Sequence, residues 1–318
     1  MLKPGMSLAV IAAACLATGA MAMFAILQFM NNDTQTASNS TNTTVPVNNI
    51  ARTNRNNNGP WASNLYLTSG TSFDALSEAQ LFVESAGVPS IAQTDDGSLI
   101  AAFQWFPEDN QEAFDKIATS TSQDGGITWS NPISITVENY PEVNQRPFDP
   151  TIVNAGDGTL RLYFSSSPGK TTRSIHSATS TDGTTFVYEG ENLSESGTEL
   201  YDSAVINLNE TWHMITPWAP DLGAYHGTSS DGLLFTMQEK ITDEASLNWT
   251  GNLTVVDDLA YFFGTGISSN GFQPWYRTTS DMMSWSEPIE LDIDRGSDPA
   301  ALYVPDQGWI IIYVAPAT

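Results

Sequence analysis

The chain has 318 residues, with 11 Lys and Arg against 36 Asp and Glu and a formal net charge of −25. Such a charge repels nucleic-acid phosphates and anionic membrane surfaces, so neither is an expected partner. Only 15% of the residues are charged and 41% are hydrophobic, which is enough for a large core. Because Cys15 is the single cysteine, an intramolecular disulfide and a cysteine-ligated metal site are excluded.

Residues 6–30 form an uncharged apolar stretch that follows Lys3. The stretch is long enough to cross a bilayer as a helix, which needs about 20 residues. It also fits a secretory signal, with Ala20-Met21-Ala22 as the cleavage site. Both alternatives place the remainder of the chain outside the cell. Residues 1–30 therefore predict an extracellular or cell-surface protein, either secreted or anchored by an N-terminal transmembrane helix.

Residues 31–60 have the composition of a disordered linker. Ten of the thirty are Asn and eight are Ser or Thr, so this segment has too few apolar residues to bury a core. The linker contains three Asn-x-Ser/Thr sequons, at Asn32, Asn39 and Asn42, and four more begin at Asn192, Asn209, Asn248 and Asn252. In an exported chain these sequons predict a glycoprotein, provided that the host has the machinery.

The remainder of the chain repeats one turn. Four segments share a Ser/Thr-x-Asp frame that ends in Trp or Phe, and their aspartates are 58, 49 and 50 residues apart: Ser122–Trp129, Ser180–Phe186, Ser229–Phe235 and Thr279–Trp285. In such a turn the Asp carboxylate accepts backbone N–H bonds, and glycine supplies positive φ. A hairpin of alternating apolar residues precedes each turn. Four strands per repeat of about 50 residues describe a propeller blade.

The two ends of the repeat region complete a fifth blade. Residues 300–304 and 308–314 form an inner hairpin with no chain left to finish it. Residues 65–73 look like a third strand and its turn, without the aspartate. A blade that takes strands from both termini leaves no free sheet edge there. We therefore predict an all-β fold, a five-bladed β-propeller in one domain over residues 61–318.

The turns resemble those of two related groups of propellers. Ser122–Trp129 matches the S-x-D-x-G-x-T-W Asp box of sialidases and other BNR-repeat proteins. The three shorter turns are similar to those of the five-bladed glycosidases, the arabinanase, β-xylosidase and invertase group. The resemblance spans nearly the whole repeat region. Because Asp boxes occur in enzymes, lectins and receptors alike, the resemblance specifies the fold well and the chemistry poorly.

In such propellers the functional site lies around the central axis, where the first strand of each blade begins. The five starts are Val88-Pro89-Ser90, Phe148-Asp149-Pro150-Thr151, Tyr201-Asp202-Ser203, Gly251-Asn252-Leu253 and Ser297-Asp298-Pro299-Ala300. We expect Asp149, Asp202 and Asp298 to converge at one mouth of the channel. Glycoside hydrolysis needs one protonated carboxyl as acid and one ionised carboxylate as base or nucleophile. Alternatively, the three aspartates cap strands or bind a cation.

The sequence departs from both groups at the first blade. The five-bladed glycosidases carry an Asp base there, and this chain has Val88-Pro89. The first of three arginines that grip the substrate carboxylate in sialidases is also missing. The resemblance places the acid, a Glu, at the start of the third blade, where Asp202 stands with Glu199 three residues upstream. The predicted catalytic pair is Asp149 with Asp202 or Glu199, and Asp298 tunes the pair or replaces the missing base.

Aromatic rings accompany these carboxylates in the loops and strand starts that face the same end of the channel. Trp and Tyr rings stack on sugar C–H surfaces, so the combination suits carbohydrate. The predicted substrate-binding residues are Trp105, Arg146, His176, Trp218, Tyr225, His226, Trp275 and Arg277. The alternative is that half or more of the rings pack between blades. The histidines show no metal-ligand spacing, and no nucleophile elbow or phosphate-binding glycine loop is present.

Together these features predict an exported, monomeric propeller that acts on a glycan or glycoprotein by carboxylate-based hydrolysis of a neutral sugar linkage. No cofactor is required, although a divalent cation such as Ca²⁺ is a candidate ligand of the central channel. The alternative is a non-catalytic carbohydrate- or protein-binding propeller. Residues 1–60 hold three basic residues and one acidic residue, which leaves 8 basic and 35 acidic residues, a net −27, on the predicted propeller.

Overall fold

The computed structural model describes residues 59–141, 145–156, 158–167, 172–218, 223–242, 247–268 and 271–317. The predicted apolar helix and most of the predicted linker lie outside these ranges. Among the described residues, no helix is long and apolar enough to cross a membrane. The residues from Ser63 onward form one unit, and all of its regular structure is β-strand.

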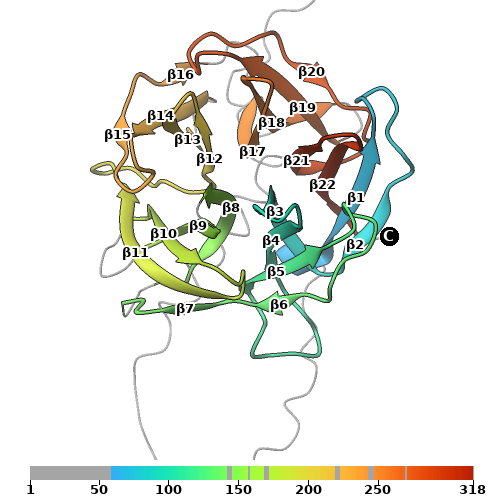
Figure 1. Cartoon of the computed structure of the whole chain (residues 1–318), viewed down its shortest axis with the longest axis horizontal. Helices are drawn as coiled ribbons and strands as arrows, with labels where there is room; N and C mark the ends of the chain where they lie inside the picture. The colour runs from blue at the N-terminus through green and yellow to red at the C-terminus, as the bar shows by residue number, and fades with distance from the viewer. Residues whose placement is uncertain are drawn as a thin grey trace, which may run out of the picture. The chain divides into compact units, whose positions relative to one another are not determined.

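Five antiparallel sheets are arranged around a central axis, as predicted (Figure 1). Blade 1 consists of β3 (Ala86–Gln93), β4 (Leu99–Trp105), β5 (Lys116–Ser122) and β6 (Ile133–Ser134). Blade 2 consists of β8 (Phe148–Gly156), β9 (Thr159–Ser166), β10 (Ser174–Ser180) and β11 (Thr185–Leu193). The segment that links these blades adds β7 (Thr136–Glu138), a short outer strand parallel to β11 that the repeat did not predict.

The next two blades follow the same order. Blade 3 consists of β12 (Ala204–Leu208), β13 (Thr211–Pro217), β14 (Gly223–Ser229) and two short outer strands, β15 (Thr236–Met237) and β16 (Ile241–Thr242). Blade 4 consists of β17 (Asn248–Val256), β18 (Leu259–Ser268), β19 (Gly271–Thr279) and β20 (Ile289–Glu290). In every blade the first strand lies innermost, and each first strand contacts the first strand of the next blade (Figure 1).

Strands from both ends of the domain build blade 5, which confirms the predicted closure. Its inner strands are β21 (Ser297–Val304) and β22 (Gly308–Pro316), and its outer strands are β1 (Ser63–Gly70) and β2 (Gln80–Val83), with a 3-10 turn at Pro60–Ala62 before them. Strand β1 pairs with β22 along its whole length, from Ser63 opposite Pro316 to Gly70 opposite Trp309. The N-terminal strand is therefore the third strand of the last blade.

The hydrophobic core consists of five clusters, one between each pair of neighbouring blades. The largest buried rings, Trp249 and Trp275, lie in the cluster between blades 3 and 4. This arrangement follows from the alternation along each strand, because both faces of a blade pack against a neighbour. Of the predicted substrate-binding rings, Trp275 is therefore one that packs between blades, as the alternative prediction had it.

The four repeated turns have a structural role. In the first turn Asp124 Oδ1 accepts the Thr128 N–H at 2.8 Å, and in the fourth Asp281 Oδ1 accepts the Ser284 N–H at 2.7 Å. Hydrogen bonds within the turns lower the pKa of both carboxyls to about 2. The third turn also packs on the preceding blade. A Cβ on Gly232 would come within 2.7 Å of an Arg161 side-chain nitrogen, and the φ of +75° favours glycine at this position.

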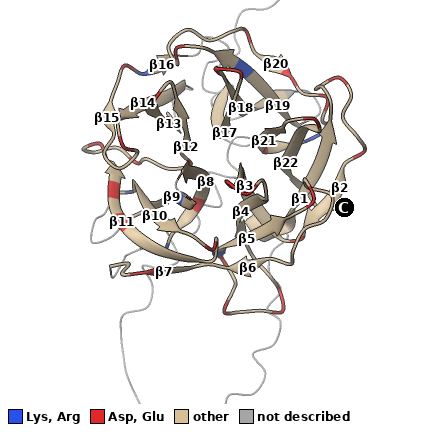
Figure 2. Cartoon of the chain, viewed as in Figure 1, with Lys and Arg blue, Asp and Glu red and all other residues tan. Residues whose placement is uncertain are grey.

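The fold divides the four sequons of the propeller into two kinds. Asn192 and Asn252 have buried side chains, each 4% exposed, and Asn192 uses its amide to donate to Leu233 O and Ser177 Oγ. Asn209 and Asn248 are exposed. Of the four, only Asn209 and Asn248 offer an accessible amide to a modifying enzyme in the folded state. The acidic residues are spread over turns of all five blades (Figure 2).

Candidate functional site

One residue at the start of each first strand forms a ring of five at the channel mouth. The register of the first hairpins aligns these positions, and we call them the mouth ring: Val88, Asp149, Asp202, Thr250 and Asp298. Four of the five have a left-handed backbone, with φ between +46° and +52°. In blades 1, 2 and 5 this conformation coincides with a β-bulge near the start of the first strand.

In blade 4 the residue at the mouth ring differs from the one predicted. Its bulge contains one more residue than those of blades 1, 2 and 5, because Asn248 and Asn252 face Thr265 and Phe263 on the second strand. As a result Thr250 takes the ring position, and the predicted start at Gly251-Asn252 lies deeper in the strand. The Thr250 hydroxyl hydrogen-bonds to Asp298, which places blade 4 in contact with the carboxylates of the mouth ring.

The three predicted aspartates interact with one another. Burial raises the pKa of Asp149 to about 7, while the charge of Arg173 partly opposes this effect and that of Asp298 adds to it. Burial and the neighbouring charges of Asp149 and Asp298 raise the pKa of Asp202 well above its ordinary value. Burial likewise raises the pKa of Asp298, against hydrogen bonds from Thr250 and Ser297. Carboxyls that interact in this way titrate as a group and not independently.

Hydroxyl groups of neighbouring blades fix the backbone at the mouth ring. Ser165 Oγ in β9 accepts the Asp202 N–H at 3.0 Å, and Thr265 Oγ1 in β18 accepts the Asp298 N–H at 2.9 Å. Ser165 also donates a long hydrogen bond of 3.5 Å to Asp149 Oδ2. Because the hydroxyls that bind Asp202 and Asp298 come from the preceding blades, the packing of the blades sets the position of the carboxylates. This preorganisation is what a catalytic or binding site requires.

Arg173 lies beside Asp149 and was not among the predicted site residues. Its Nε donates to Glu199 Oε2 at 2.5 Å, and Glu199 accepts the Arg173 N–H at 3.1 Å as well. The guanidinium lies 5.3 Å from the Tyr201 ring centroid and 5.9 Å from that of Phe148. Its Nη1 is buried and has no hydrogen-bond partner within the described ranges. The sequence feature that could have identified Arg173 as a site residue is its position directly before β10, the third strand of blade 2, at the mouth side.

The predicted alternative acid, Glu199, therefore positions Arg173. Both of its contacts with Arg173 use a carboxylate oxygen as the acceptor. Asp202 lacks an ion pair among the described residues and has the raised pKa that a general acid needs. Of these two carboxylates, Glu199 has an ion pair and Asp202 has none among the described residues.

In blade 1, Val88 occupies the mouth-ring position that an aspartate occupies in blades 2, 3 and 5. Val88 keeps the left-handed backbone, at φ +49°, that Asp149 and Asp202 adopt, although a β-branched residue disfavours it. This blade contributes a different buried carboxylate, Asp115, which was not among the predicted site residues. Asp115 accepts from Gln104 Nε2 at 2.9 Å and pairs with Arg146. Arg146, predicted to bind substrate, is thus engaged at the junction of blades 1 and 2.

Three of the predicted substrate-binding residues are buried inside the blades, and Arg277 is half-buried beside one of them. His176 is 1% exposed, between Ser174 Oγ and the Tyr188 hydroxyl at 2.9 Å each. His226 is 5% exposed and its Nε2 shares a hydrogen bond of 3.0 Å with His213 Nδ1. Trp275 is 1% exposed, and the Arg277 guanidinium lies 5.7 Å from its ring centroid. No ligand reaches the three buried side chains in the folded state without rearrangement of the blade.

The remaining three predicted rings lie on the mouth side, two of them half-buried and one buried. Trp105 is half-buried at the end of β4 and packs on the cluster between blades 5 and 1. Trp218 is half-buried and Tyr225 is 6% exposed, with their ring centroids 5.9 Å apart. Trp218 and Tyr225 are the one pair of predicted substrate-binding rings that we find in contact among the described residues.

A cation site in the channel finds no support among the described residues. Within those ranges no group of three or more His, Cys, Asp or Glu side chains has the geometry to hold a metal ion. The three aspartates are close enough for their charges to shift one another's pKa. They are not arranged as a set of metal ligands. We therefore assign no metal to the mouth ring.

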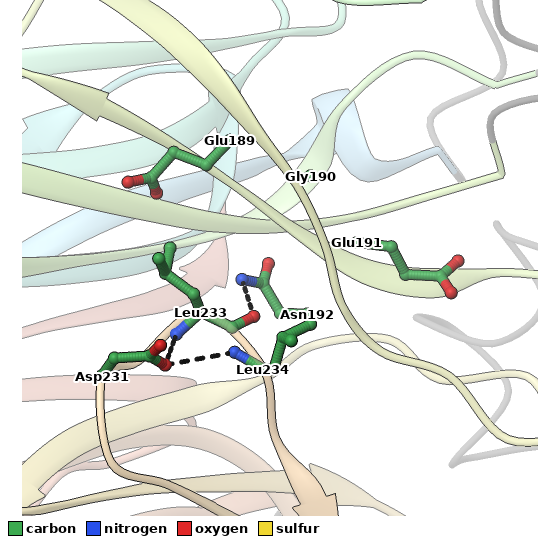
Figure 3. A pocket seen from close by; sticks show the side chains of 7 residues that line it. All are labelled: Glu189, Gly190, Glu191, Asn192, Asp231, Leu233 and Leu234. Carbon is green, nitrogen blue, oxygen red and sulfur yellow. Dashed lines mark hydrogen bonds between the residues drawn. The ribbon is translucent and has the colours of Figure 1, made fainter.

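A hollow of about 500 Å³ lies on the outer side of the propeller, away from the mouth ring. It lies between β11 and the third Asp-box turn (Figure 3). Its acidic residues are already engaged: Glu189 pairs with Arg161 at 2.8 Å, and Asp231 accepts the Leu233 N–H at 2.8 Å. The chemistry of the mouth ring, not the size of this hollow, defines the candidate site.

Neither a family model nor a curated protein sequence matches the chain. Solved structures do. An exo-β-1,3-galactanase from Phanerochaete chrysosporium has a TM-score of 0.55 at 12% identity, over 80% of this chain and 64% of its own. A Hadza microbial sialidase has a TM-score of 0.54 at 15% identity, over 80% and 59%. The chain thus spans less than two-thirds of either protein.

A third match covers nearly all of the other protein. The endo-arabinase from Bacteroides thetaiotaomicron has a TM-score of 0.54 at 14% identity, over 73% of this chain and 94% of that one. At such identities the similarity shows the fold alone. The structural neighbours are those that the turn sequences led us to expect, and the chain has the five-bladed propeller fold found among glycoside hydrolases.

Proposed function

We propose that this protein is an exported, glycan-directed propeller that hydrolyses glycosidic bonds with the carboxylates of its mouth ring. The observation that carries the proposal is the electrostatic coupling of Asp149, Asp202 and Asp298 at one end of the channel. Glycoside hydrolysis needs one carboxyl that keeps its proton near neutral pH and one that gives it up. The fold shared with glycoside hydrolases supports a carbohydrate ligand.

The roles follow from the surroundings of each carboxyl. Asp202, whose pKa is raised by burial and by the charges of both other aspartates, donates the proton to the leaving-group oxygen. Asp149 is the base or nucleophile, because the Arg173 guanidinium favours its ionised form. Asp298 raises the pKa of both carboxyls through its charge. It also serves as the third carboxylate, because blade 1 has Val88 at that position. The high negative charge of the propeller disfavours acidic sugars as substrates.

The test is a screen of chromogenic furanosides, pyranosides and sialosides with the wild-type protein, Asp149→Asn and Asp202→Asn. Removing a general acid or base costs about 10²- to 10⁴-fold in rate, so each variant should lose at least about 100-fold. Asp124→Asn, in an Asp-box turn, is the matched control and should keep its activity. Full activity in both mouth-ring variants refutes the proposal.

The second candidate is a non-catalytic glycan-binding propeller, and the observation in its favour is Val88. A mouth ring with an apolar residue at the first blade lacks one of the carboxylates on which the similar glycosidases depend. This alternative predicts that no glycoside is cleaved while glycans still bind, and that Asp149→Asn weakens the binding.

A further inference from the structure

A lysine occupies the cleft between the two aromatic rings near the mouth of blade 3. Trp218 directly follows β13, and its N–H donates to Gly223 O at 2.9 Å. Tyr225 lies in β14. The Lys240 Nζ is 3.8 Å from the Trp218 ring centroid and 4.6 Å from that of Tyr225. Within the described ranges no carboxylate lies in ion-pair distance of Lys240, so its ammonium rests on the two rings.

The cleft adjoins the segment that carries Asp202. Leu200, two residues before Asp202, packs in the same cluster as Trp218 and Tyr225, between blades 2 and 3. The Leu200 N–H also donates to Arg173 O at 3.2 Å, which ties the cleft to the residue whose guanidinium lies beside Asp149.

The position of the Lys240 ammonium indicates which kind of ligand the cleft between the two rings favours. A cation over a Trp or Tyr face at an exposed site favours that position by about 2- to 5-fold. Lys240 is exposed, so its side chain can leave the cleft and keep its hydration. A neutral sugar that displaces it forfeits the cation–π contact, whereas a ligand with its own ammonium restores that contact and adds C–H stacking. The net −27 of the propeller attracts such a ligand as well.

We propose that Trp218 and Tyr225 form a subsite for a sugar unit with a free amino group, as in a glucosamine polymer, and that Lys240 fills this subsite in the free protein. The inference rests on the proposed glycan-directed function and names its substrate class. Lys240 acts as a competitor in cis, since the ligand binds only when the lysine has left the rings.

The experiment is calorimetric titration of Asp202→Asn, in which turnover is blocked, with glucosamine oligosaccharides and their N-acetylated counterparts of equal length. We expect the amino form to bind more tightly. Adding Lys240→Gln should tighten binding of the amino form by about 3- to 6-fold, because a lysine that favours the cleft by about 2- to 5-fold leaves it open only part of the time. Lys116→Gln, which removes a charge from an exposed lysine on β5, is the matched control and should have no such effect.

Trp218→Leu keeps an apolar side chain and removes the π face, so it should abolish the preference for the amino form. Its far-UV spectrum and Tm report whether the blade is intact. Equal binding of the two oligosaccharides, or equal effects of Lys240→Gln and Lys116→Gln, overturns the subsite. If the amino form binds as expected while the wild-type protein cleaves no glycoside, the subsite stands and the hydrolytic function fails.

Discussion

Replacing Asp149 with asparagine is expected to stabilise the folded protein, and to do so only at neutral and alkaline pH. Asp149 is 9% exposed, and its pKa is raised to about 7 in the folded state. An unfolded Asp has a pKa of about 3.9. A raised folded pKa means that the unfolded state releases the proton first, so stability falls as the pH rises from about 4 to about 7. Asparagine is uncharged and tolerates the left-handed backbone at φ +51°.

The magnitude follows from the difference between the two pKa values. A gap of about 3 units corresponds to about 4 kcal/mol at pH 8, and to less than about 1 kcal/mol at pH 4. This figure is an upper value, because Asp202 and Asp298 share the same protons. For a domain of this size each kcal/mol moves the Tm by roughly 2–4 °C. We therefore expect Asp149→Asn to raise the Tm by several degrees at pH 8 and to leave it nearly unchanged at pH 4.

The assay is urea denaturation and calorimetry at pH 4, 6 and 8, with Asp124→Asn as the control of opposite sign. The pKa of Asp124 is about 2 because turn N–H and hydroxyl groups bind its carboxylate, so its removal destabilises the protein at pH 8. A loss of stability in Asp149→Asn at pH 8, or a gain of equal size at pH 4 and 8, would show that the carboxyl is neither desolvated nor coupled as argued.

Three further outcomes are expected. Trp275→Ala should lower the free energy of unfolding by about 3–5 kcal/mol in urea titrations, because the ring is 1% exposed in the cluster between blades 3 and 4; a change below about 1 kcal/mol would contradict that packing. Val88→Asn should raise the free energy of unfolding by about 1 kcal/mol, since a β-branched residue is strained at φ +49° and asparagine is not. Its control is Val187→Asn, at an exposed position of β11 outside the left-handed region, which should not stabilise the protein; equal effects of the two changes would remove the argument from strain. Asp281→Asn should lower the Tm at pH 7 and approach wild type at pH 2, because its folded pKa of about 2 lies below the unfolded value and its contribution is lost as the pH falls from about 4 to about 2. A Tm difference that calorimetry finds independent of pH would contradict this account.

The fold was predictable because the repeated turn fixes the number and spacing of the strands. Asp124 and its three counterparts recur at intervals that only one blade fills, and the unfinished hairpin at residues 300–314 indicates how the ring closes. The bulge of blade 4 was not predictable. Its extra residue shifts the ring position to Thr250, and no residue type in Asn248–Asn252 indicates the register with β18.

The candidate site was predictable in its aspartates and less so in their partners. Asp149, Asp202 and Asp298 share a place in the repeat, so the symmetry of the fold brings them together. The contact of Arg173 with Glu199 depends on segments outside the repeated turns, and sequence spacing does not encode it. Aromatic residues carry the same ambiguity, because the strand patterns around Trp275 and Tyr225 do not reveal which ring lies near the mouth.

The pairing of β1 with β22 has a consequence for how the chain folds. The contact between Ser63 and Pro316 joins the two ends of the domain, so the ring closes only after the last strand has been made. Closing the ring requires the longest loop in the domain, which slows folding relative to the local hairpins. Until that step β1 lacks its partner β22, and a chain that crosses a membrane before folding would keep its propeller open until its C-terminus arrives.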